Sequence, residues 1–207
     1  MSKTIKLATV LAAVALTLAA CITIDSGGGD SDSGSSASTS KHNDADVTFA
    51  QDMIPHHAQA IVMSRMAKNQ ARDPRLRQLA ADIQAAQGPE IDQMSGWLKA
   101  WDEDVPSTRG MGGMGGDGDH MGDFGMMDDY DMPGMMTGRQ MMKLDQASGS
   151  TFDRMWLQMM IQHHEGAIEM AKVEQRNGLS TNAIELARTI ESTQTTEIAL
   201  MKSILRS

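Results

Sequence analysis

The sequence contains a single cysteine, Cys21, and few aromatic residues: three phenylalanines, three tryptophans and one tyrosine. Without a second cysteine, the chain cannot form an internal disulfide. In contrast to these shortages it carries 20 methionines, which is the most unusual feature of its composition. The chain is therefore rich in thioether sulfur and almost without thiol.

Long hydrophobic runs are absent after residue 20. The first 20 residues are basic at the start and continue as an apolar stretch of 14 residues, too short for a membrane-spanning helix and typical of an export signal. The stretch ends in Leu18-Ala19-Ala20-Cys21, which looks like a bacterial lipobox, although an ordinary cleaved signal beside an incidental cysteine is the alternative. We expect a protein exported from the cytoplasm and lipid-anchored through Cys21, at the outer face of the cell membrane or in the cell envelope.

Basic residues are also scarce, with 18 Lys and Arg against 27 Asp and Glu and a net charge of -9. Loss of the signal would remove Lys3 and Lys6 and leave -11. This balance disfavours nucleic acid and anionic lipid surfaces as partners and favours cations. Residues 21–46, after the lipidated cysteine, consist mainly of Gly, Ser and Asp and predict a flexible tether, in which His42 is expected to be solvated.

The rest of the chain contains an internal duplication. A shift of 107 residues aligns the two halves without a gap, from the segment MIPHHAQAIVM onto MIQHHEGAIEM and on through the residues that follow. His56 and His57 fall on His163 and His164, and Glu90 falls on Glu197. These two histidine pairs hold four of the six histidines in the chain.

Each repeat has the pattern of a helical hairpin. The first helix is expected from about Val47 to Gln70, and Asp73-Pro74 marks the start of the second. Gly88-Pro89 is expected to kink that second helix. The third helix is expected from Ser150 or Thr151 to a C-terminal glycine, Gly178, and the fourth is capped by Ser180.

Two such hairpins, each with one apolar stripe, can bury their stripes only against each other. The sequence therefore predicts an all-α, ferritin-like four-helix bundle over residues 47–207. It is made of a first hairpin (47–102), a long Met/Gly/Asp-rich loop (103–149) and a second hairpin (150–207).

Each histidine pair is predicted to lie at the edge of the apolar stripe, near the seam of the bundle. A single histidine there would more often be a satisfied core or boundary residue. Four of them in register across a duplication favour a shared metal ion, because burying imidazoles without a strong partner is costly.

The residue types around the histidines indicate which metal. Di-iron bundles use Glu-x-x-His, whereas Met53 and Met160 stand three residues before His56 and His163. Thioether with imidazole is a soft ligand set that suits copper, above all Cu(I), although other transition metals remain open. The candidate ligands are His56, His57, His163, His164, Met53, Met63, Met160 and Met170, with Glu90, Glu197, Met94 and Met201 as weaker candidates.

The loop between the repeats carries ten of the methionines among Gly and Asp. It has neither helical nor strand periodicity, so we expect a mobile insertion that contributes nothing to the core, with low-complexity drift as the alternative reading. As a functional element it would offer soft ligands for Cu(I) and harder ones for Cu(II). Its weaker metal candidates are Met111, Met114, His120, Met121, Met126 and Met127.

The motifs FAQDMIPHHAQAIVMSRMA and MMIQHHEGAIEMAKVE, each followed by a helix with the pattern Q..EI..M, resemble the duplicated signature of a bacterial exported family classed as a domain of unknown function. The resemblance covers about residues 45–205 without the Met-rich loop. It implies a ferritin-like four-helix fold. Since some members of the family are copper-binding proteins, it also implies that the histidine and methionine positions named above form the metal site.

Together these features favour an extracytoplasmic lipoprotein that binds copper for sequestration, buffering or tolerance, rather than an enzyme. A ferritin-like redox enzyme that oxidises iron or copper is one alternative, and a metal-free interaction module of the envelope is another. The sequence identifies no protein partner and leaves open whether the protein forms oligomers.

Overall fold

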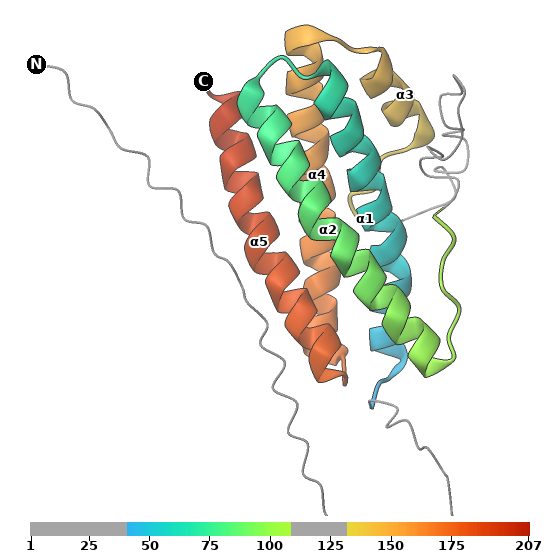
Figure 1. The fold of residues 1–207 in the computed structure, drawn as a ribbon. Coiled ribbons are helices and arrows are strands. Elements are labelled where there is room, and N and C mark those ends of the chain that lie inside the picture. Colours follow the sequence, from blue (N-terminus) through green and yellow to red (C-terminus); the bar gives the residue numbers. More distant parts are fainter. Residues whose placement is uncertain (1–40, 109–131) are drawn as a thin grey trace, which may run out of the picture. The chain divides into compact units, whose positions relative to one another are not determined.

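The structure, a computed structural model, describes residues 41–108 and 132–207. In these residues it contains five helices and no strand: α1 (Asp44–Gln70), α2 (Pro74–Trp101), α3 (Gly138–Gln146), α4 (Gly149–Asn177) and α5 (Thr181–Leu205). The four long helices form a bundle (Figure 1), so the predicted all-α fold is confirmed. The predicted signal, the predicted lipidation site Cys21 and all but the last few residues of the predicted tether lie outside the described residues.

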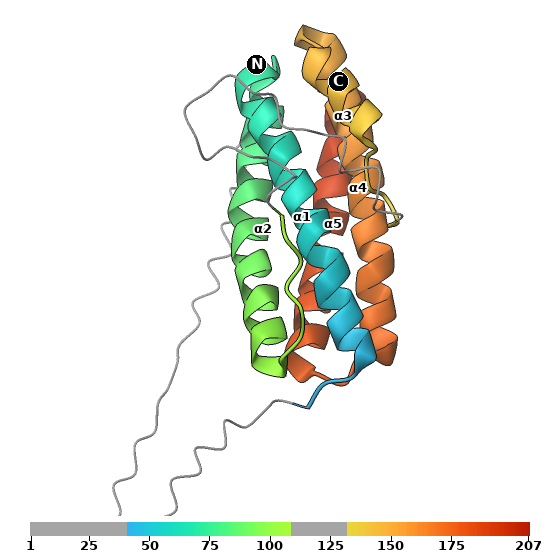
Figure 2. The same cartoon turned by 90° about the vertical axis from the view of Figure 1, so that its right-hand side faces the viewer.

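Each long helix packs against two others, α1 against α2 and α4, and α5 against α2 and α4. Neighbouring helices run antiparallel around the bundle (Figures 1 and 2). This arrangement explains the long connection between the hairpins. Because α2 ends at the opposite end of the bundle from the start of α4, the chain must return along a helix of 28 residues, about 40 Å.

The core consists of two apolar clusters, one toward each end of the bundle. One cluster joins the C-terminal half of α1 to the N-terminal half of α4, and the other joins the N-terminal part of α1 to the C-terminal half of α4. On both α1 and α4 the histidine pair stands between the residues of the two clusters. The histidines therefore lie near the middle of the bundle.

The first helix begins at Asp44, three residues before the predicted Val47. Asn43 and Asp46 form a reciprocal capping box, in which the Asn43 side chain accepts from the Asp46 backbone and Asp46 accepts from the Asn43 N–H. Residues 44–46 thus belong to the bundle rather than to the tether. His42, predicted to be solvated, instead stacks on Trp101 with 4.6 Å between ring centroids.

Two further local features bear on the sequence predictions. The second helix continues as an α-helix through Gly88-Pro89, with Pro89 inside it, and the kink expected there stays a prediction. The third predicted helix, α4, ends at Asn177 and Gly178 follows it as expected, in an extended conformation with a φ of -65°. A Cβ on Gly178 would overlap the Glu174 carboxyl group.

The connection between the hairpins is not wholly outside the core, contrary to our expectation. Its last part forms α3, which begins with a capping box at Thr137. Met135, Met136 and Met141 from this part are buried in the same apolar cluster as Met63 and Met160. The sequence shows no periodic pattern that predicts this packing. Most of the contacts come from a short, irregular segment whose conformation depends on α1 and α4.

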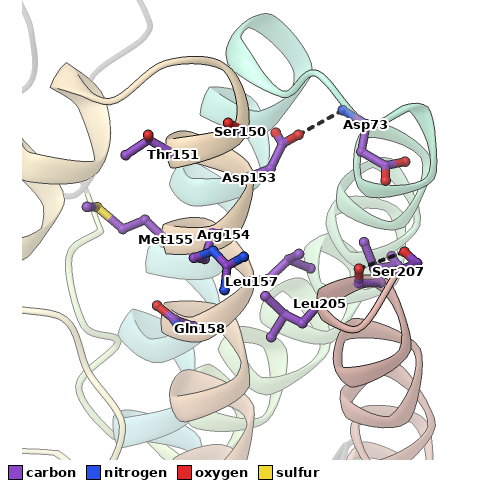
Figure 3. Close-up of a pocket in the computed structure, with 11 residues that line it drawn as sticks. Asp73, Ser150, Thr151, Asp153, Arg154, Met155, Leu157, Gln158, Leu205 and Ser207 are labelled. Atoms are coloured by element: carbon purple, nitrogen blue, oxygen red, sulfur yellow. Dashed lines mark hydrogen bonds between the residues drawn. The ribbon is translucent and has the colours of Figure 1, made fainter.

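Two duplicated aspartates bind each hairpin to the other. Asp153, near the start of α4, accepts from the backbone N–H groups of Arg72 and Asp73 at the α1–α2 turn, both at 2.9 Å; Figure 3 shows the bond to Asp73. Asp46, at the equivalent position of α1, accepts from the N–H groups of Leu179 and Ser180 at the α4–α5 turn. Each hairpin thus supplies an acceptor for the turn of the other hairpin, whose second helix is capped by its own Asp73 or Ser180.

None of the helices in the described part of the chain is long and apolar enough to cross a membrane.

Glu174 provides a test of the packing at one end of the bundle. Burial, together with the hydrogen bond to Asp46 and its negative charge, raises the pKa of Glu174 to about 8. Since the folded state then holds a proton that the unfolded chain has lost, the stability from this group is present at acidic pH and decreases as the pH rises from about 5 to 8. We expect the unfolding free energy of the wild type, relative to Glu174→Gln, to fall by at least about 1 kcal/mol over that range in urea titrations. Parallel pH profiles for the two proteins would contradict this.

Candidate metal centre

The antiparallel packing of α1 on α4 brings the two histidine pairs together. His56 and His57 on α1, and His163 and His164 on α4, are all at most 1 % exposed, which is a deeper position than the predicted edge of the stripe. The rings of His56 and His163 lie face to face, with 3.8 Å between centroids and 37° between planes. The centroids of His163 and His164 are 6.4 Å apart.

The second histidine of each pair contacts a carboxylate from the same hairpin. His57 Nε2 lies 2.7 Å from Glu90 Oε2, and His164 Nε2 lies 2.7 Å from Glu197 Oε2. The duplication is therefore reproduced at the level of individual hydrogen bonds. It places the two duplicated glutamates behind the imidazoles rather than beside one another.

Two glutamines complete the polar residues at this height of the bundle. Gln87 and Gln194 are equivalent in the duplication, lie one turn before Glu90 and Glu197, and are 3 % exposed. The sequence shows their repetition, but nothing in it marked them as site residues. Together these side chains form what we call the polar layer: His56, His57, Gln87, Glu90, His163, His164, Gln194 and Glu197.

Five ring nitrogens of the polar layer are buried without a hydrogen-bond partner. They are Nδ1 of each histidine and, in addition, Nε2 of His163. His56 Nε2 contacts the carbonyl oxygen of Pro133 at 3.0 Å. Carbonyl and carboxylate oxygens accept, so we assign the ring proton to Nε2 in His56, His57 and His164, which leaves the Nδ1 lone pair bare in the neutral ring.

A bare nitrogen lone pair in a dry core has a large energetic cost. An unsatisfied buried polar atom destabilises a fold by about 1–3 kcal/mol. Protonation is not a remedy here: burial, with smaller contributions from nearby His57 and His164, lowers the pKa of His56 to about 3. Burial also lowers the pKa of His163, and the other three imidazoles lower it as well. His56 and His163, whose rings contact each other, therefore stay neutral, and a cation is the partner that their unpartnered nitrogens lack.

Thioether groups flank the polar layer on both sides. Met53, with Met94 and Met170, belongs to one apolar cluster, and Met63, with Met160 and Met201, belongs to the other. All but Met170 are fully buried, and Met170 is partly buried. The predicted methionine candidates of the helices therefore belong to the two apolar clusters on either side of the histidines.

A complete set of hard ligands is not assembled. Within residues 41–108 and 132–207, no group of three or more His, Cys, Asp and Glu side chains is arranged to hold a metal ion. An ion bound here would draw on few imidazole nitrogens, with sulfur or a shift of side chains supplying the remainder. The loop candidates Met111, Met114, His120, Met121, Met126 and Met127 lie outside the described residues.

The fold and the site define a class of duplicated four-helix bundle proteins with a buried imidazole layer between methionine-containing clusters. Residues 46–205 match the family described as Domain of unknown function (DUF305). The chain belongs to this family, as the resemblance of its motifs predicted.

Solved structures of related proteins share the fold. A candidate secreted protein of this family from Streptomyces coelicolor is 32 % identical, over 82 % of this chain and 94 % of that one, with a TM-score of 0.65. CopM in a Cu(II)-bound form is also 32 % identical, over 78 % of this chain and 95 % of its own, with a TM-score of 0.60. CopM has further been solved in Cu(I)-bound and Ag-bound forms. Metal binding thus occurs among the structural relatives of the chain.

A shorter match comes from the uncharacterized protein L153 of Acanthamoeba polyphaga mimivirus, which is 45 % identical over 53 residues. The matched region is 26 % of this chain and spans only 35 % of that protein.

The tautomer assignment can be measured directly. In the metal-free protein at pH 8, we expect His56, His57 and His164 each to carry the proton on Nε2, because an oxygen accepts from that atom and none accepts from Nδ1. Long-range ¹H–¹⁵N spectra of the imidazole rings distinguish the two tautomers. Glu90→Leu should release His57 from its assigned tautomer while leaving His164 unchanged, so His164 serves as an internal control. A proton on Nδ1 of His57 in the wild type would refute the assignment.

Proposed function

We propose that this protein binds copper in the polar layer and acts as an extracytoplasmic lipoprotein that sequesters or buffers the ion. The observation that carries the proposal is that each of the four buried histidines has an unpartnered ring nitrogen, which is Nδ1 in His56, His57 and His164 and one of the two unpartnered nitrogens in His163. A cation that accepts nitrogen lone pairs removes their energetic cost, and it does so at the seam of the bundle.

The donor types favour copper over harder ions. Neutral imidazole with nearby thioether suits Cu(I), whereas calcium, magnesium and manganese prefer several oxygen ligands. The net charge of -9 favours cations in general. CopM, which shares the fold at 32 % identity and has been solved with Cu(II), Cu(I) and Ag, supports the same choice.

We assign Glu90 and Glu197 the role of positioning residues rather than ligands. Each carboxylate accepts from Nε2 of a histidine and thereby directs the Nδ1 lone pair of that ring into the core. A carboxylate behind a histidine fixes its orientation and makes it a better donor to a metal. The ligands would then be the Nδ1 atoms, with thioethers such as those of Met53 and Met160 completing the coordination.

A metal-oxidising enzyme of the ferritin-like kind is the second candidate. Three residues before His56 and His163 stand methionines, and three before His57 and His164 stand isoleucines, where a di-iron enzyme would have glutamates. We therefore propose binding without turnover. Oxygen uptake that is sustained on addition of Fe(II) or Cu(I) would favour the enzyme instead.

The binding proposal is tested by anaerobic Cu(I) titration against a chromogenic chelator, with aerobic Cu(II) in parallel. The full chain would carry Cys21→Ser so that its thiol cannot bind copper. We expect His57→Ala with His164→Ala to abolish high-affinity binding by the bundle. Glu90→Gln with Glu197→Gln, which keeps every histidine, should weaken binding by about 10–100-fold because the rings lose their charged partners.

The matched control is Glu185→Gln, which removes a carboxylate from the exposed face of α5. It should leave both stoichiometry and affinity unchanged. Circular dichroism distinguishes loss of ligands from loss of fold in the histidine variant. If all variants bind like the parent protein, the polar layer is not the site. A parent protein without bound metal would favour the metal-free interaction module.

We further propose that Cys21 carries the lipid that keeps the protein at the outer face of the membrane. In a bacterial host, the wild-type chain should fractionate with membranes and gain the mass of a lipidated N-terminal cysteine. Cys21→Ser should be released or remain unprocessed, with no added lipid in its mass spectrum. Because the bundle begins after residue 40, copper binding by the helices should be the same in both proteins. A wild-type protein whose N-terminal cysteine gains no lipid mass would refute the anchor.

A further inference from the structure

The polar layer is covered by a short segment that belongs to neither hairpin. Residues 132–137, which we call the strap, lead from the Met-rich connection into α3. The strap starts with a tight turn, closed by the Met135 N–H donating to the Met132 carbonyl at 3.2 Å. Pro133 and Gly134, with a φ of 79° at the glycine, occupy the two central positions as in a type II turn.

The turn lies directly against the backbone of α4 beside the histidines. A Cβ on Gly134 would lie 2.6 Å from the Gln162 carbonyl oxygen and 3.0 Å from that of His163. On the facing side, a Cβ on Gly166 would overlap the Pro133 carbonyl group and lie 2.7 Å from the Gly134 nitrogen. Two glycines thus permit a contact that no other pair of residues would allow.

A side chain of α1 holds the other end of the strap. The amide of Gln59, fully buried, donates to the Met136 carbonyl at 2.8 Å and accepts from the Met136 N–H at 2.7 Å. The Pro133 carbonyl meanwhile accepts from His56 Nε2 at 3.0 Å. The strap therefore provides the third oxygen that orients an imidazole of the polar layer, after the two glutamates.

The duplication singles out the residues that hold the strap. Gln59 and Gly166 occupy the same position of the two repeats, two residues after His57 and His164, yet they differ in type. Each contacts the strap in a way that its counterpart could not, since a glycine has no amide and a glutamine would fill the space of the turn. The two repeats have diverged at the position where this non-duplicated segment docks.

On the sides of α2 and α5 the histidines lie behind Glu90 and Glu197, whose side chains are only 16 % and 13 % exposed. The strap is held at the layer by a close glycine contact, by the hydrogen bonds to Gln59 and His56, and by the burial of Met135 and Met136 in the apolar cluster. Opening a short irregular segment costs less free energy than separating long helices that share an apolar core. Opening of the strap would therefore leave the four long helices packed.

We propose that the strap controls the access of the ion to the polar layer, and that Gln59 and Gly166 are the positioning residues that set how often it opens. The proposal rests on the proposed function, because it concerns the entry and exit of the ion bound there. It predicts that loosening the strap changes the rates of uptake and release much more than the number of ions bound.

The test uses Gly166→Ala and Gln59→Leu in the full chain with Cys21→Ser. Gly166→Ala places a methyl group against Pro133, and Gln59→Leu removes both hydrogen bonds to Met136. In stopped-flow transfer of Cu(I) to a chromogenic chelator, we expect each variant to release the ion at least about tenfold faster than the parent protein, with unchanged stoichiometry. Uptake by the parent protein should level off as Cu(I) increases, at the opening rate of the strap, and this plateau should rise in both variants.

The matched control is Gly96→Ala, also in a helix, where a Cβ would meet nothing within 4 Å. It should leave the rates unchanged, which separates strap loosening from the general effect of replacing a helical glycine. Hydrogen exchange supplies an independent readout, because the Met136 amide proton is bonded to Gln59. We expect this proton to exchange faster in Gly166→Ala and Gln59→Leu without metal, and at the parental rate in Gly96→Ala.

The outcomes separate the two proposals. If the parent protein binds Cu(I) but Gly166→Ala, which keeps Gln59, exposes the Met136 amide without faster transfer, the strap opens and is not the route of the ion. Uptake that stays proportional to Cu(I) concentration with no plateau would refute the strap proposal in the same way. If the parent protein binds no Cu(I) at all, the proposed function fails, and control of access fails with it. If Gly166→Ala does not fold, the release rate of Gln59→Leu and the plateau in uptake by the parent protein still test the strap proposal.

Discussion

The structure depends on the contact between His56 and His163 where α1 crosses α4. Stacking two neutral imidazoles at 3.8 Å in a dry core requires that both stay unprotonated, and burial lowers both pKa values accordingly. It also requires acceptors around them that orient the rings. The carboxylates on α2 and α5 and the carbonyl of the strap meet that need, so every element near the middle of the bundle is arranged with respect to these four rings.

The duplication explains most of this arrangement and also makes its exceptions visible. The glutamate–histidine pairs, the buried glutamines and the methionines on either side occur twice, at equivalent positions. The strap occurs once, and it docks where Gln59 and Gly166 break the repeat. Glu174 is another break, because the equivalent residue of the first repeat is Ala67. The duplicated helices provide the histidines and methionines of the site, and the strap, which is not duplicated, covers them.

The bundle, and the place of the histidines near its seam, could be predicted because the same helical pattern of apolar residues occurs in both repeats. The full burial of the histidines could not, since stripe position alone does not show that two polar faces will meet and exclude water. The burial of Met135 and Met136 against the helices could not be predicted either. Their segment has no period, and it is held by a contact between Gly134 and Gly166 that exists only once the chain has folded. The sequence does show that Gln59 and Gly166 differ, but this is one of four differences between the two eleven-residue motifs, so it does not by itself point to a docked segment.

The reciprocal hydrogen bonds of Asp46 and Asp153 have a consequence for how such a fold can arise. In each hairpin, two backbone N–H groups of the turn obtain their acceptor from the other hairpin. A lone hairpin with this sequence pattern would be incomplete in solution and would find its missing acceptor in a second copy of itself, related by a twofold axis. Fusion of two such copies into one polypeptide preserves that exchange. It also frees one half to change without the other, which a symmetric dimer of identical chains can never do.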